Sequence, residues 1–186
     1  MASPNFNIFC GQHVDYDNLD KSLLDKLGLE QYPNYDNCGD SKIIYDKYKE
    51  HYMRCLVQGS LCEHNRERYF YKLHPLNNKI DKSTIRSINS SARIDDDVTS
   101  IPTDKSEENE IKYNIKTPNG LSKLNFEDPN LLKYYNCEQL KNFDHMPYVD
   151  AYRQYYVKYM KCMLLAKIIE TYREKIFDKL RSLQPR

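Results

Sequence analysis

The stretch YVDAYRQYYVKYMKCMLLAKIIETYREKIFDKLRSL, residues 148–183, decides the expected fold. Its apolar and aromatic residues recur at spacings of three and four, which is the period of one face of an α-helix. Pro147 precedes it and suits the first position of such a helix. At 1.5 Å per residue the helix would be about 50 Å long, so one short hairpin could not cover it. Residues 162–169 are apolar on nearly every face, which indicates burial by more than one neighbour.

Two shorter helices are predicted to form a hairpin in the first part of the chain. The first begins with a cap at Asp40 or Ser41 and ends at Gly59. The second begins at Cys62 and is closed by Pro75. The turn around Gly59 would place the two helices antiparallel to each other.

Short helical patterns also flank these elements, at residues 19–27 before Gly28 and from Pro129 onward. The expected fold class is therefore mostly α, with two helical hairpins or pairs and one long C-terminal helix. The expected parts are an N-terminal arm with the cysteine-containing hairpin at 1–76, an extended irregular linker at 77–128, and the C-terminal helical pair at 129–186.

The linker at 77–128 is rich in Ser, Asn, Asp and Lys and has no sustained hydrophobic period. Within it, the three aspartates at 95–97 are expected to be a solvated charge run. So few apolar residues cannot offset the entropy of ordering the backbone, so order here would require the surfaces of other subunits.

Composition limits the classes of partner. The chain has 28 basic and 27 acidic residues and a net charge of +1, which gives no long-range field to attract nucleic acid. No segment approaches the roughly 20 consecutive apolar residues of a membrane span, and the N-terminus lacks the pattern of a cleaved signal or presequence. We expect protein partners, no nucleic acid, and at most a peripheral place on a membrane. The 17 tyrosines suit contact surfaces, because each ring is large and its hydroxyl can reach a polar rim.

The stretch HYMRCLVQGSLCEHNRERY, residues 51–69, contains the main candidate for a covalent link. Cys55 and Cys62 flank the predicted turn, where two antiparallel helices are close enough for a disulfide. The other disulfide candidates are Cys10, Cys38, Cys137 and Cys162, of which the last two could pair between the C-terminal helices. Because six cysteines allow 15 pairings, and free cysteines also pack as small hydrophobic residues, the oxidation state stays open.

A zinc site is the alternative for the same stretch. It would use two nitrogens and two thiolates, from His51, Cys55, Cys62 and His64. The chain has no phosphate loop, no Rossmann glycine pattern and no HExxH motif. No catalytic residues and no cofactor are therefore expected, and the protein is predicted not to be an enzyme.

Helices carrying spaced cysteines over residues 38–75 resemble the cysteine-bearing accessory subunits of mitochondrial respiratory-chain complexes. The spacings here differ from the paired C-x9-C segments typical of that family. The resemblance implies a non-catalytic subunit that holds neighbouring subunits together, on the intermembrane-space side of the inner membrane. The alternative function is an independent disulfide-stabilised or zinc-binding helical interaction module, such as a secreted parasite protein.

The linker provides a first prediction. In the isolated recombinant chain, protease should cut within 77–128 quickly, whereas the same chain within its assembly should resist, because partner surfaces would supply the contacts that order the linker. Timed proteolysis with mass spectrometry of the fragments measures this. Equal resistance in both forms would mean that the segment orders itself.

Overall fold

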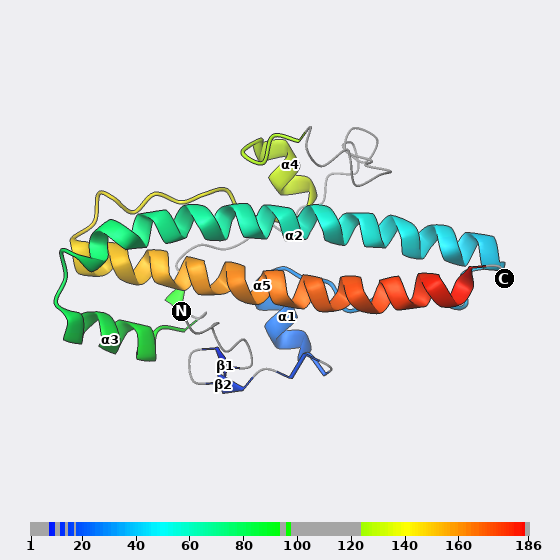
Figure 1. Ribbon diagram of the computed structural model, residues 1–186, viewed down its shortest axis with the longest axis horizontal. Helices are drawn as coiled ribbons and strands as arrows, with labels where there is room; N and C mark the ends of the chain where they lie inside the picture. Colours follow the sequence, from blue (N-terminus) through cyan, green and yellow to red (C-terminus); the bar gives the residue numbers. More distant parts are fainter. Residues whose placement is uncertain are drawn as a thin grey trace.

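Two long helices run side by side in opposite directions in the computed structural model (Figure 1). They are α2 (Ser41–Asn77) and α5 (Tyr148–Leu183). The prediction of a mostly α-helical protein with one long C-terminal helix is confirmed. The structure describes residues 8–9, 12–13, 15–16, 18–93, 96–97 and 124–184.

Helix α2 continues through the predicted turn, so the prediction of a hairpin around Gly59 is wrong. A Cβ added to Gly59 would lie 3.6 Å from Cγ2 of Ile169, so this glycine faces α5 at an ordinary packing distance. Ser60 donates its hydroxyl to the carbonyl oxygen of Leu56 at 2.9 Å, a bond made within the helix. A glycine inside a helix costs only about 0.5–1 kcal/mol, and packing along the length of α5 outweighs that cost.

Helix α3 (Lys82–Ser91) lies inside the predicted irregular linker, so the linker prediction is wrong for these residues. Ile88 is buried in a cluster with Tyr152 of α5, and the Tyr152 hydroxyl donates to Oδ1 of Asn89 at 3.0 Å. Contact with α5 therefore stabilises a helix whose own apolar pattern is short. Residues 94–95 and 98–123 of the linker lie outside the described residues.

Helix α5 begins and ends where the sequence predicted. Sequence reasoning found no partner in the chain long enough to cover it, but α2 is as long and covers it throughout. Aromatic contacts mark the antiparallel register, with Tyr52 against Phe177 toward one end and Phe70 against Tyr159 toward the other.

Two short helices pack on this pair. Helix α1 (Lys21–Leu27) ends at Gly28, as predicted, and a φ of 69° gives this glycine the left-handed conformation typical of a helix end. Helix α4 (Pro129–Tyr134) begins at the predicted proline but ends earlier than the sequence suggested. It stops because Asn136 adopts a left-handed φ of 56°.

Three hydrophobic clusters form the interior: one joins α1, α2 and α5, a second joins α2, α3 and α5, and a third joins α2 and α4. Each combines residues from 1–76 with residues from 129–186, so these parts form one folding unit. A small antiparallel pairing of β1 (Ile8–Phe9) with β2 (Gln12–His13) lies near the N-terminus. Among the described residues, no helix has the length and apolarity needed to cross a membrane.

Gly59 provides a test of the continuous helix. Gly59→Ala should raise the free energy of unfolding by roughly 0.5–1 kcal/mol, because alanine favours the helix and the site has room for a Cβ. Gly28→Ala is the control and should lower it by roughly 1 kcal/mol, because its φ is left-handed. Urea unfolding measures both, and a loss at Gly59 would favour the predicted turn.

Candidate functional site

The predicted disulfide partners Cys55 and Cys62 lie on the same helix, α2. They are two turns apart, about 10 Å along the axis, whereas a disulfide needs its Cα atoms within roughly 7 Å. Both thiols are free and buried against α5. The prediction of this disulfide is wrong, because the expected turn that would have brought the two cysteines together is helical.

The alternative zinc set is also spread along α2: His51, Cys55, Cys62 and His64. The two histidines are about 20 Å apart along the helix axis, so the four side chains cannot bind one ion. His51 Nδ1 lies 3.1 Å from the hydroxyl oxygen of Tyr35, and His64 Nε2 lies 3.8 Å from Oε1 of Glu127. The zinc prediction is wrong for this set. In the part of the chain that the structure describes, no group of three or more His, Cys, Asp or Glu is placed to hold a metal ion.

The other disulfide candidates have different surroundings. Cys38 is exposed and its thiol is free. Cys137 is half-buried and Cys162 is buried, and both are also free. Cys10 lies outside the described residues, so pairings with it stay predictions.

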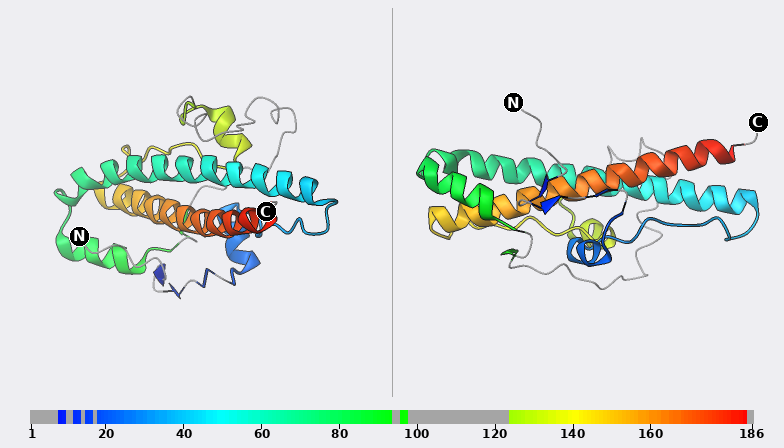
Figure 2. Two further views of the ribbon diagram at one scale, coloured as in Figure 1. Left: turned by 45° about the vertical axis from the view of Figure 1, so that its right-hand side comes forward. Right: turned by 90° about the horizontal axis from the view of Figure 1, so that it is seen from below.

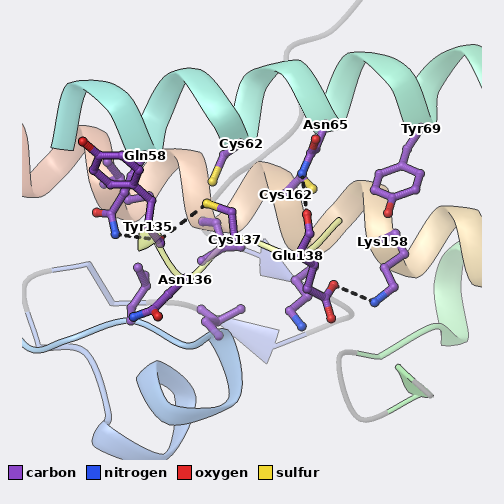
Figure 3. Close-up of a pocket in the computed structure, with 15 residues that line it drawn as sticks. Gln58, Cys62, Asn65, Tyr69, Tyr135, Asn136, Cys137, Glu138, Lys158 and Cys162 are labelled. Carbon is purple, nitrogen blue, oxygen red and sulfur yellow. Dashed lines mark hydrogen bonds and ion pairs between the residues drawn. The ribbon is translucent and has the colours of Figure 1, made fainter. Parts of the chain in front are cut away.

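A small cavity brings three of the cysteines together between α2, α5 and the residues that follow α4 (Figure 3). Cys62 of α2, Cys137 and Cys162 of α5 all line it. The Cys62 and Cys137 side chains point toward one another. The Cys137 thiol donates a hydrogen bond to the carbonyl oxygen of Tyr135 at 3.6 Å. The cavity volume is about 30 Å³, which gives room for about one or two waters.

Polar side chains of α2 hold the residues after α4 against this cavity. Gln58 Nε2 donates to the carbonyl oxygen of Tyr135 at 3.1 Å, and Asn65 Nδ2 donates to that of Glu138 at 3.2 Å. Between them, the left-handed Asn136 ends α4. The backbone N–H of Cys137 then donates to the carbonyl oxygen of Leu132 at 2.8 Å, which completes a Schellman motif and directs the chain toward α2.

Two buried lysines of α5 line the same cavity and pair with carboxylates. Lys158 Nζ lies 2.7 Å from Oδ1 of Asp97 and 2.8 Å from Oε2 of Glu138. Lys161 Nζ lies 2.9 Å from Oδ2 of Asp97. The expectation that the aspartates at 95–97 are solvated is wrong for Asp97, whose side chain is 5% exposed. The sequence feature that could have predicted this burial is the pair Lys158 and Lys161, which lie among the apolar residues of α5 and need buried partners.

Burial controls the chemistry of the thiols. It raises the pKa of Cys55 and of Cys162 to about 12. The neighbouring Cys137 side chain, together with burial, raises the pKa of Cys62 above its ordinary value. These three thiols are therefore protonated near neutral pH, and a protonated thiol is a poor nucleophile and a poor metal ligand.

A larger groove, of about 740 Å³, runs between α2 and α5 on a different side of the pair. All of its lining residues belong to these two helices except Phe126. Gly59, Ser60 and Ala166 lie along it, and small side chains of this kind let a neighbouring chain approach closely. In the right-hand view of Figure 2, α1 and α4 both lie on one side of the helix pair.

Exposed aromatic residues stand beyond the two ends of this groove. Phe70 lies about one turn beyond the last groove-lining residue of α2, on the same side of that helix, and is 42% exposed. Phe177 lies about one turn beyond the last groove-lining residue of α5, on the same side of that helix, and is 48% exposed. We call the groove with these two residues the open face.

Charged residues of both signs line the open face. Toward Phe70, Arg66 pairs with Glu63 at 2.8 Å and leaves the charge of Glu67. Toward Phe177, Lys167 and Arg173 outnumber Glu170.

Comparison of the chain with models of known protein families, with curated proteins and with solved structures finds no match.

The buried ion pairs give a prediction about stability. Lys158→Met should lower the free energy of unfolding by about 3–5 kcal/mol, because it removes a cation from two buried carboxylates. Lys72→Met is the matched control. Its pair with Asp144 is exposed, so its loss should cost no more than about 1 kcal/mol. Urea unfolding compares the two, and equal small losses would mean that the buried cluster contributes little.

Proposed function

We propose that the protein is a non-catalytic structural subunit of a large multiprotein assembly and that it contacts a neighbouring subunit through the open face. The observation that carries this proposal is the groove of about 740 Å³ with an exposed phenylalanine beyond each end. Aromatic side chains beside charged ones at a groove are a combination typical of protein interfaces, where aromatic residues are enriched and the rim is polar.

The shape and charge of the open face suit one kind of occupant, an amphipathic helix of a neighbouring subunit. Two antiparallel helices leave a groove in which a third helix can bury its apolar side. Glu67 would favour the positive N-terminal end of that helix, and Lys167 and Arg173 would favour its negative C-terminal end. The docked helix would therefore run from the Phe70 end toward the Phe177 end.

For the identity of the assembly we propose a mitochondrial respiratory-chain complex, on the side that faces the intermembrane space. This part of the proposal rests on the resemblance of residues 38–75 to cysteine-bearing accessory subunits. A disulfide between Cys55 and Cys62 no longer supports it, since both residues lie on one helix.

Native gel electrophoresis of detergent-solubilised mitochondria, with mass spectrometry of the bands, tests the proposed function. The chain should migrate in a high-mass band together with respiratory-chain subunits. Migration as a free monomer of 22.2 kDa would overturn the subunit role. A high-mass band from another compartment would overturn only the choice of complex.

The open face can be tested by substitution in the tagged full-length chain. Phe70→Glu and Phe177→Glu should each reduce incorporation into the high-mass band at least about tenfold, because burial of a phenylalanine contributes about 1.5–3 kcal/mol. Ile43→Glu is the control, since Ile43 is 45% exposed but does not line the groove. Circular dichroism should show that all three variants fold. Normal incorporation of both phenylalanine variants would contradict docking at this face.

A further inference from the structure

We propose that Cys62 and Cys137 form a disulfide site that ties α2 to the segment between α4 and α5. Both residues line the small cavity, and Figure 3 shows the two side chains pointing toward one another. No sequence pattern suggested this pairing, because the two residues lie far apart along the chain and only the packing of α4 against α2 brings them together.

The neighbouring thiol of Cys162 is a poorer partner for either residue. It lines the same cavity, but in Figure 3 its sulfur lies apart from those of Cys62 and Cys137. Cys162 lies within helix α5, whereas Cys137 follows the Schellman motif in a non-helical segment. Formation of a sulfur–sulfur bond requires the two sulfurs to move to about 2.05 Å from each other. Cys137 can make that movement without distorting a long helix.

Oxidised glutathione, a small disulfide, is a sufficient oxidant. The half-buried Cys137 attacks one sulfur of glutathione as a thiolate, forms a mixed disulfide and releases one reduced glutathione. Cys62 then attacks the Cys137 sulfur as a thiolate and releases the second. Two cysteine thiols and one oxidised glutathione thus become one protein disulfide and two glutathione thiols, with the two thiol protons passing to the released glutathiones.

Burial of Cys62 determines the speed of the second step. Because its pKa is raised, the reactive thiolate is scarce near neutral pH. Closure should therefore accelerate about tenfold for each unit of pH between about 7 and 9.

The experiment uses the purified full-length chain, equilibrated with reduced and oxidised glutathione at a series of ratios. After acid quenching, the chain is denatured, alkylated and digested without reductant. Mass spectrometry should find a peptide that links Cys62 to Cys137, while Cys38, Cys55 and Cys162 are alkylated. Alkylation of both Cys62 and Cys137 at the most oxidising ratio would overturn the proposal, and so would a link from either of them to Cys162.

Two variants and a thermal measurement complete the test. Cys162→Ser should keep the link, and Cys137→Ser should abolish it. Because the bond closes a long loop, the oxidised wild-type chain should unfold roughly 10 °C higher than the reduced one, and Cys137→Ser should show no such difference. A mapped link that lowers the unfolding temperature would show that the bond does not fit the folded chain, which would also overturn the proposal.

Discussion

The packing of α2 against α5 is the constraint on which the rest of the structure depends. Tyrosines on both helices bury their rings in the contact between them, beside aliphatic residues. Their hydroxyls then bind the backbone of the connecting segments: Tyr69 accepts from the N–H of Lys141, and Tyr155 accepts from that of Phe143. The abundance of tyrosine is thus explained, because one side chain supplies both apolar area and a bond to a loop.

The polar groups buried beside this packing fix the positions of the connections. Lys158 and Lys161 draw Asp97 and Glu138 into the interior, from points before and after α4. Pairs of this kind add little net stability compared with apolar packing, but each becomes costly when a partner is missing. The cluster therefore fixes Glu138 against α5, and the adjacent Cys137 lies beside α2.

The open face and the small cavity lie on different sides of the helix pair. The open face has an exposed phenylalanine beyond each end and charges that differ between the ends, which suits a docked helix. The small cavity between α2, α5 and the residues after α4 is too small for a substrate, but it brings together residues from three segments of the chain. A bond between Cys62 and Cys137 would fasten the segment after α4 and leave the open face unchanged.

Local features of the sequence were sufficient for the long C-terminal helix and for the end of α1 at Gly28, because a hydrophobic period and a left-handed glycine act within a few residues. They were not sufficient for Gly59, for the helix within the linker, or for the partners of Cys62 and Asp97. At Gly59 a local preference of about 1 kcal/mol was outweighed by contacts along a whole helix. Which thiol meets which, and which carboxylate is buried, depends on residues distant in the chain, so only the tertiary structure decided them.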